Sequence, residues 1–599
     1  MFYLRIGVLI LLVSASLVAQ GPYPLVCTAM AANVPIARAE GLAEEMGQIV
    51  VVCSGGMPVP NGQVIVTSNV QVFLNTNITS RVIDDPYTEA LLLIDEPGSY
   101  YSPGPQLACG EAETYLDPAT GTCPVTSANG DGTGNYSGQK NMLLPQYSGA
   151  GGLTYRRPNV WRGRCIGTNC ATSAPNSLAW LGVPLDPPGT GPTRVIRIVN
   201  IRANANGVPT SGTLVPSTIS ALISISGAAG FSLVNPNMTV AIVEAGLTWG
   251  LRSADNSGAL PSGGLNYLQC VPNNAPLAMN PTTASAPNGV SFVLRISENF
   301  GTAFRVRSTQ AQNSPGMIYN TESMFYNPDF SADFGHLNLA GLATQGTRFL
   351  VRFSGPPGGL QVHAPITGTW SMFPNTGSAR LIAAGLDGSG SDFTPVPPSS
   401  AALNTAYKTD MVYVYEMDTA DPAQISLIDL PFYIAHTGQP YVTPGTTTVS
   451  VNYAPTSIQN YATGGWVPRF ADLGDVRPLA TLSSCSAQPK LFAAITSKSG
   501  TTSARVWSVQ LTNSGPAPAN NARITGFGLT QTYGAACTPV VLTPLPATVG
   551  TIAANGGTGS TNLTIDFTSC PSLARFTAAI SYAADGGAAG TSTFNNLFR

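Results

Sequence analysis

The residues best suited to ligand chemistry lie in one arginine-rich segment, residues 155–165. Four arginines and two aromatic residues occur there within ten positions, although only 10% of the chain is charged. Guanidinium groups bind carboxylates through paired hydrogen bonds, and aromatic rings supply flat apolar contact area. We therefore predict an acidic-glycan site that is formed by Arg156, Arg157, Trp161, Arg162 and Arg164. The alternative is that these arginines bridge carbonyl groups and acids between neighbouring domains.

A glycine-rich loop has the spacing of a cation site. Its polar residues alternate with glycines and are Asn129, Asp131, Thr133 and Asn135. Calcium prefers oxygen ligands from alternate residues of a tight turn, so the loop is a candidate calcium site. The loop contains a single carboxylate and no closing glutamate, so a flexible turn is the alternative. We expect no other cofactor.

Catalytic patterns are weak. The three histidines, His336, His363 and His436, are each isolated in a different stretch, and no Gly-x-Ser-x-Gly motif precedes them. A Ser-His-Asp triad needs only one histidine, so hydrolysis stays open. We expect a protein without catalytic activity. The alternative is a carbohydrate-binding protein or polysaccharide-active enzyme whose surface is lined by arginines and by Trp180, Trp249, Trp370 and Trp466.

The N-terminus and the cysteines indicate an oxidising compartment. Arg5 precedes an apolar run and small residues, which predicts a signal peptide over residues 1–19. An even number of cysteines behind such a segment predicts disulfides. Short separations favour the pairs Cys27–Cys53, Cys109–Cys123, Cys165–Cys170 and Cys537–Cys570. Cys270 and Cys485 are then left for each other.

The composition excludes two classes of partner. The 599 residues include 27 basic and 30 acidic side chains, without a long run of either sign. Neither a nucleic-acid binder nor a polybasic membrane-surface protein is expected from this balance. No segment after the leader is apolar for long enough to span a bilayer. The low charge and the scarcity of lysine favour an extracellular bacterial protein.

Strand patterns dominate the chain, which predicts an all-β fold of several β-sandwich domains in tandem. Short β-branched and aromatic runs are separated by Gly, Pro, Asn and Ser clusters. Only Ala39–Met46 and Tyr87–Leu92 are candidates for short helical turns. The density of glycine, proline and other strand-breaking residues divides the chain after the signal peptide. It predicts a β domain at 20–105, a disulfide-stapled loop region or insertion at 106–190, and β-sandwiches at 191–345, 346–482 and 483–599.

The last of these regions resembles a known domain. The run Ala504–Gly515 alternates as a strand into Thr-Asn-Ser-Gly and is followed by Ala519–Ala522. It is similar to the Ig-like, CARDB-like domains of bacterial secreted and surface proteins. The resemblance implies an adhesion, spacer or assembly module without catalytic residues. With this resemblance, we expect a secreted or cell-surface adhesion or assembly protein whose partners are other extracellular proteins, glycans or copies of itself.

Overall fold

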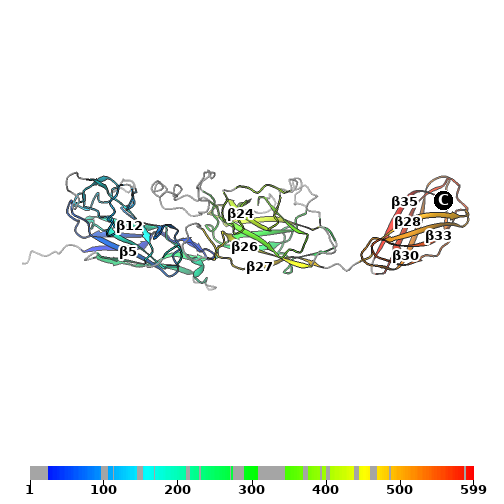
Figure 1. Cartoon of the computed structure of the whole chain (residues 1–599), viewed down its shortest axis with the longest axis horizontal. Coiled ribbons are helices and arrows are strands. Elements are labelled where there is room, and N and C mark those ends of the chain that lie inside the picture. The colour runs from blue at the N-terminus through cyan, green and yellow to red at the C-terminus, as the bar shows by residue number, and fades with distance from the viewer. Residues whose placement is uncertain are drawn as a thin grey trace, which may run out of the picture. The chain divides into compact units, whose positions relative to one another are not determined.

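The computed structural model is almost entirely β-structure and consists of two compact units (Figure 1). The first unit ends at Thr481, and the second, here called the C-terminal unit, consists mainly of Leu482–Arg599. The predicted signal peptide lies outside the described residues. The structure describes residues 24–599 except 96–105, 112, 145–152, 167–168, 211–215, 228–230, 270, 274–288, 308–344, 368–375, 392–393, 400–404, 437–443, 459–467, 484–487 and 586–587.

One large sheet forms the first lobe of the first unit and encloses its own hydrophobic core. Its strands follow in the order β15 (Phe231–Val234), β1 (Leu25–Ala31), β4 (Ile49–Gly55), β12 (Gly189–Val199), β7 (Tyr87–Ile94), β10 (Val160–Arg164), β11 (Ser177–Pro184), β5 (Thr67–Leu74), β14 (Ser217–Ser226), β16 (Asn237–Glu244) and β2 (Ile36–Arg38), with β6 (Val82–Asp84) beside β7. Smaller elements complete the lobe: β3 (Glu44–Glu45) with β13 (Arg202–Ala203), β8 (Lys140–Met142) with β9 (Tyr155–Arg156), and a 3₁₀ turn (Ala205–Gly207).

A parallel pairing joins the first and last strands of this lobe. β1 pairs with β15 so that Leu25 faces Phe231, and β2 pairs with β16 so that Ile36 faces Ile242. The offset in sequence between paired residues is the same in both pairings, so the two segments run side by side without a shift. Since β1 leads directly into β2 and β15 into β16, these two bent segments bring the ends of the large sheet together. We call these two pairings, β1 with β15 and β2 with β16, the parallel seam.

Two sheets form the second lobe and share one core. Phe292 and Phe432 stack within one sheet, and Phe353 of the other sheet packs edge-on against both. The first sheet has the order β17 (Leu247–Arg252), β19 (Phe292–Glu298), β25 (Leu427–His436), β21 (Leu360–Pro365) and β23 (Thr405–Tyr407). The second has the order β18 (Leu265–Leu268), β27 (Val476–Ser483), β26 (Gly445–Ala454), β20 (Arg348–Ser354), β24 (Val412–Thr419) and β22 (Ser378–Ile382).

A buried ion cluster lies beside the second sheet. The carboxylate of Glu416, on β24, is fully buried and pairs with Arg307 and with Arg348, whose Nε lies 3.0 Å from Glu416 Oε2. It also accepts a hydrogen bond of 2.7 Å from the backbone N–H of Gly346. Two cations and one anion thus share a site from which water is excluded.

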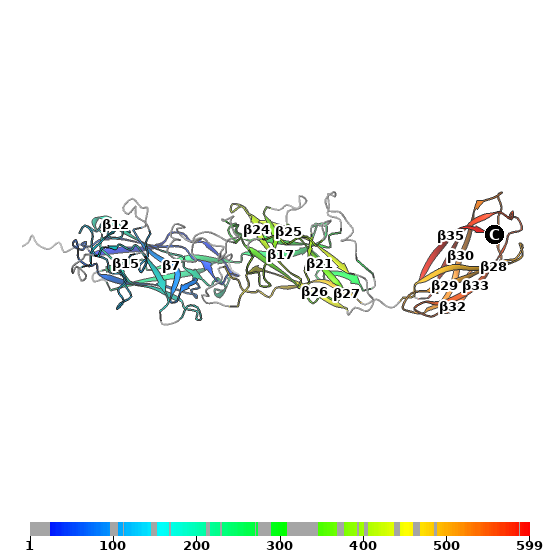
Figure 2. The same cartoon turned by 45° about the horizontal axis from the view of Figure 1, so that its top comes forward.

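The C-terminal unit is a sandwich of two four-stranded sheets (Figure 2). Trp507 is completely buried between them, as its alternation with Val509 and Leu511 predicts. One sheet has the order β28 (Leu491–Gly500), β29 (Arg505–Asn513), β33 (Gly557–Asp566) and β31 (Val540–Val541). The other has the order β32 (Ala547–Ile552), β30 (Ala519–Tyr533), β34 (Arg575–Ala583) and β35 (Ala589–Phe598).

The structure divides the first unit differently from the sequence prediction. Residues 106–190, predicted as a loop region or insertion, supply β10 and β11, which lie between β7 and β5 in the large sheet. The first lobe therefore spans 25–244. Strands β19 and β25, assigned above to the separate domains 191–345 and 346–482, pair with each other. Glycine and proline density marks connections, but strand pairing across those connections determines the lobes.

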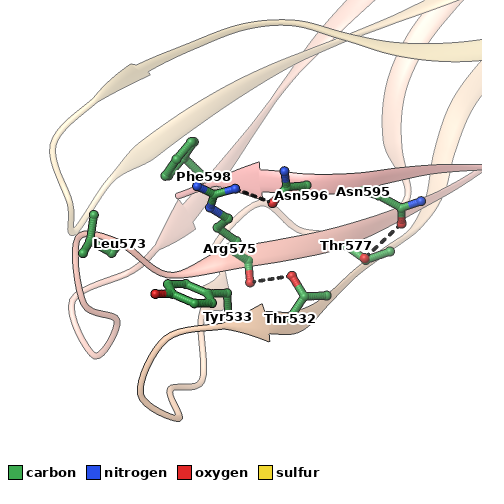
Figure 3. A pocket seen from close by; sticks show the side chains of 8 residues that line it. All are labelled: Thr532, Tyr533, Leu573, Arg575, Thr577, Asn595, Asn596 and Phe598. Carbon is green, nitrogen blue, oxygen red and sulfur yellow. Dashed lines mark hydrogen bonds between the residues drawn. The ribbon is translucent and has the colours of Figure 1, made fainter.

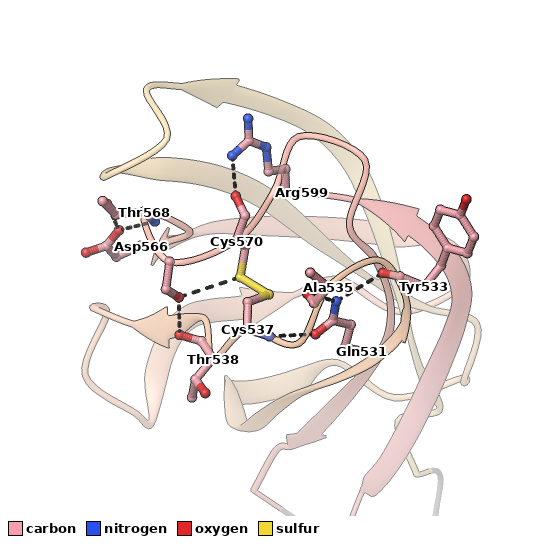
Figure 4. The surroundings of a disulfide bond; sticks show 10 residues. Gln531, Tyr533, Ala535, Cys537, Thr538, Asp566, Thr568, Cys570 and Arg599 are labelled. Atoms are coloured by element: carbon pink, nitrogen blue, oxygen red, sulfur yellow. Dashed lines mark hydrogen bonds between the residues drawn. A yellow bond between two sulfur atoms is a disulfide. The ribbon is translucent and has the colours of Figure 1, made fainter.

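Four disulfides are present among the described residues, and they are the pairs favoured by short sequence separation. Cys270 and Cys485 lie outside the described residues. Cys27 and Cys53 face each other on the neighbouring strands β1 and β4. Cys537–Cys570 links the loop after β30 to the loop before β34 (Figure 4). Disulfides of this kind persist in oxidising compartments.

Removing the Cys537–Cys570 bridge is expected to destabilise the C-terminal unit by ~3–4 kcal/mol, because it closes a loop with a sequence separation of 33. Differential scanning calorimetry of the full chain with both cysteines changed to serine measures this cost. The matching double serine variant of Cys165–Cys170, whose separation is 5, should lose only ~2 kcal/mol from the first unit. Equal losses in the two variants would contradict the chain-entropy explanation.

Candidate functional site

A pocket of about 850 Å³ lies at one end of β30, β34 and β35, on the outer face of their sheet (Figure 3). Sequence alternation places two polar side chains of β34 in the pocket, because Phe576 and Ala578 point into the core while Arg575 and Thr577 point outward. The pocket is lined by Thr532, Tyr533, Leu573, Arg575, Thr577, Asn595, Asn596 and Phe598.

Two bulges gather these side chains on one face. The pairing of β30 with β34 shifts between Gln531 and Tyr533, and the pairing of β34 with β35 shifts between Phe576 and Ala578. A bulge places two consecutive residues on the same side of a strand. Thr532 and Tyr533 are consequently both exposed on β30, and Asn595 and Asn596 are both exposed on β35. Asn596 adopts φ 59°, a left-handed conformation that asparagine tolerates better than most residues.

Arg575 lies at the centre of the pocket. Its guanidinium carbon is 4.5 Å from the centroid of the Phe598 ring and 5.9 Å from that of Tyr533. Its Nη1 donates a hydrogen bond of 2.8 Å to Asn596 Oδ1. Thr577 donates a similar bond of 3.0 Å to Asn595 Oδ1. Both asparagines therefore use their carbonyl oxygens within the protein, and their side-chain N–H groups donate to no partner among the described residues.

The pocket combines exposed apolar surface with a rigid support. Leu573 is 65% exposed, Tyr533 is 62% exposed and Phe598 is 49% exposed, which leaves hydrophobic area open to a ligand. The loop behind Tyr533 is held by Gln531, which donates to the carbonyls of Tyr533 and Ala535 and accepts from the N–H of Cys537 (Figure 4). The disulfide thus fixes the wall of the pocket.

Lys498 supports the pocket from the other sheet. Its Nζ lies 3.8 Å from the centroid of the Trp507 ring and donates a hydrogen bond of 2.6 Å to the Phe598 carbonyl. Partial burial, with a smaller contribution from the charge of Arg505, lowers the pKa of Lys498 to about 8. The lysine remains largely protonated at neutral pH and adds positive charge near the pocket.

The arginine-rich segment of the first lobe is engaged with its own surroundings. Arg157 is buried and donates to the Thr126 carbonyl and to Asn141 Oδ1, and Trp161 is buried in the core. Arg162 pairs with Glu111 at 3.0 Å and Arg156 donates to the Gly138 carbonyl, while Arg164 lies half-buried on β10. The partners named here are carbonyls, an amide and an acid of the same lobe. The acidic-glycan site at these five residues remains a prediction.

The polar side chains of the glycine-rich loop have hydrogen-bond partners within the loop and at Asp186. Asp131 accepts hydrogen bonds from the backbone and hydroxyl of Thr133, which lower the pKa of its carboxyl. Asn129 donates to the Thr133 hydroxyl, and Asn135 donates to Asp186. In the described part of the chain, no group of three or more His, Cys, Asp and Glu side chains has metal-binding geometry. Calcium binding by this loop remains a prediction.

The histidines and tryptophans do not form a site in the described residues. His363 is buried beside Tyr407, and burial lowers its pKa. His436 is buried against Tyr267. Trp180 and Trp249, considered above as exposed sugar platforms, are buried in the two lobe cores, so that prediction is corrected for them. The other residues considered above, His336, Trp370 and Trp466, lie outside the described residues.

The C-terminal pocket was not predicted from the sequence. Its residues are scattered over 532–598, and their convergence depends on the register of three strands and on both bulges. One local signal of the pocket is visible in the sequence: the doublet Asn595-Asn596 interrupts an alternating strand. Such an interruption is typical of a bulge.

Comparisons with known proteins identify no family. No family model and no curated protein matches the chain. Among solved structures, the C-terminal domain of the Streptococcus agalactiae AgI/II polypeptide BspA aligns over 76% of this chain and 100% of its own, at 5% identity and a TM-score of 0.24. The BSP domain of a biofilm associated protein aligns over 99% and 70%, at 9% identity and a TM-score of 0.14. A group B streptococcus pilus 2b backbone protein aligns over 74% and 98%, at 8% identity and a TM-score of 0.16.

These TM-scores are too low to carry a functional argument, and membership of the CARDB-like family stays a prediction. The C-terminal unit does have the two-sheet sandwich architecture that the resemblance implies. Among the helices of the described residues, none has the length and apolar character needed to cross a bilayer.

Proposed function

We propose that this protein is a secreted or surface-exposed adhesion protein without catalytic activity, and that its C-terminal unit binds extracellular glycans. One observation carries the proposal: the pocket on β30, β34 and β35 places exposed aromatic rings beside outward-facing amides and a guanidinium group. Aromatic rings provide rigid apolar contact area, and a few fixed polar groups orient a ligand in a site of this size.

The remainder of the chain supports a scaffolding role. The lobes of the first unit are built from large sheets with extensive cores. Several of their charged side chains form buried ion pairs, such as Arg202–Glu89. Disulfides in the first lobe and in the C-terminal unit fit an extracellular location. The ligand is expected to be a glycan on a cell or matrix surface.

Binding of the full chain to an array of neutral and acidic glycans tests the proposal. The double variant Tyr533→Ser/Phe598→Ser should bind at least about tenfold more weakly, since it removes the exposed rings of the pocket. The control is Phe492→Ser, which changes an exposed phenylalanine at the opposite end of β28 from Lys498 and should leave binding intact.

Unchanged glycan binding in the double variant would contradict the proposed site. A protein that binds no glycan but self-associates in sedimentation experiments would instead support surface assembly through its strand edges.

A further inference from the structure

Charge is distributed unevenly along the chain. The whole protein has 27 basic and 30 acidic residues, but the acidic residues of 482–599 are only Asp566 and Asp585. The same region has six basic residues, which are Lys490, Lys498, Arg505, Arg523, Arg575 and Arg599. The C-terminal unit is therefore positively charged while the remainder of the protein is negatively charged. This asymmetry favours an anionic ligand for the C-terminal unit.

The two acids do not neutralise the pocket. Asp566 accepts hydrogen bonds from Thr568, and Asp585 pairs with Arg523 at 3.1 Å. Neither contacts Arg575, which has no ion-pair partner among the described residues. Two further cations approach the same end of the sandwich, since Lys498 binds the Phe598 carbonyl and Arg599 donates to the Cys570 carbonyl at 2.7 Å (Figure 4).

The guanidinium of Arg575 leaves one edge open. Its Nη1 is occupied by Asn596, whereas Nε and Nη2 donate to no partner among the described residues (Figure 3). The same two atoms of Arg295 show what such an edge binds: there Nε and Nη2 contact the two carboxylate oxygens of Asp429 at 2.8 and 2.7 Å. An open Nε/Nη2 edge is thus a carboxylate-binding fork.

Resting on the proposed glycan-binding function, we infer that this pocket binds carboxylated sugars of an acidic polysaccharide. The carboxylate is held by the Nε/Nη2 edge of Arg575. The sugar ring packs against Tyr533 or Phe598, and its hydroxyls accept hydrogen bonds from the amides of Asn595 and Asn596. The Phe598 ring covers one side of the guanidinium, which reduces its hydration and strengthens the ion pair.

Calorimetric titration of the full chain with oligogalacturonate tests this assignment. The wild-type protein should bind it at least about tenfold more tightly than the carboxyl-reduced oligosaccharide, in which each carboxylate is an alcohol. Arg575→Gln should abolish that preference but keep the weaker binding of the reduced ligand. Arg575→Lys, which keeps the charge but loses the fork, should recover only part of the preference.

A matched control and the contrary outcomes complete the test. Arg523→Gln removes a charge from the same sheet away from the pocket and should leave the preference unchanged, and near-UV circular dichroism should show that each variant is folded. Equal binding of both oligosaccharides that still depends on Tyr533 and Phe598 would overturn the carboxylate assignment and leave the proposed function standing. Binding of a sulfated galactan that has no carboxylate, such as carrageenan, as tightly as oligogalacturonate would also overturn it, because the pocket would then bind anions without selecting carboxylates. Absence of binding to every glycan would overturn both.

Discussion

Replacement of Trp507 by alanine is expected to unfold the C-terminal unit under conditions in which the first unit remains folded. The Trp507 ring is completely buried, stacks on Phe567 at 5.9 Å and meets Phe527 edge-on at 5.7 Å. Truncation of such a side chain removes apolar contact from both sheets and leaves a cavity, at a cost of ~3–5 kcal/mol. That loss is a large share of the ~5–15 kcal/mol that stabilises a typical domain.

Chemical denaturation followed by near-UV circular dichroism measures this effect. The control Phe492→Ala removes a ring that is 45% exposed in the same unit and should cost less than ~1 kcal/mol. The reasoning would be contradicted if both variants unfolded at the same denaturant concentration. Because Lys498 lies over Trp507 and holds the Phe598 carbonyl, the tryptophan variant should also lose the glycan-binding pocket.

Substitution of Glu416 by glutamine is expected to destabilise the first unit by ~3–5 kcal/mol. The change keeps the shape of the side chain but removes the single negative charge between the buried guanidinium groups of Arg307 and Arg348. The penalty arises because both guanidinium groups lose the Glu416 carboxylate, which neutralises charge in a low-dielectric site. It should be measured as a shift of the first-unit transition in urea, with the C-terminal transition as an internal reference.

The same strand offers a matched control for this prediction. Asp418 lies two residues after Glu416 on β24, but its side chain is 35% exposed and pairs with the 32%-exposed Arg380. An exposed pair of this kind contributes at most ~1 kcal/mol, so Asp418→Asn should change stability little. Similar losses in the two variants would show that burial does not govern the cost.

Alternation in the sequence was sufficient to predict the strands of the C-terminal unit. Leu563, Ile565 and Phe567 point into its core and the residues between them point outward, as expected for a strand with one wet face. The segment Tyr87–Leu92 was misassigned as a helical turn because Glu, Ala and Leu favour helices locally. In the structure it belongs to β7, which is buried on both faces, and Glu89 is paired with Arg202 at 2.6 Å. Tertiary burial overrides the local propensity there.

The candidate binding sites were harder to predict from the sequence than the strands. The arginines of residues 155–165 are close together in sequence, which indicates a shared site. Partners such as Glu111 and the Thr126 carbonyl come from other parts of the chain and are brought to them only by the fold. Conversely, Tyr533, Arg575 and Phe598 are distant in sequence and lie together only because two strand pairings each slip by one residue. Periodicity predicts which face a side chain occupies, but it does not predict registers or bulges.

The parallel seam has a consequence for how the first lobe is made. The β4 partner of residues 25–31 is synthesised soon after them, but their second partner, β15, is synthesised some two hundred residues later. Long-range pairing of this kind slows folding, and until it forms the edges of β1 and β2 stay available to other chains. A nascent or truncated chain that lacks residues 231–244 is therefore expected to exchange its N-terminal segment with a neighbouring molecule, which makes the seam the natural point for strand-swapped dimers.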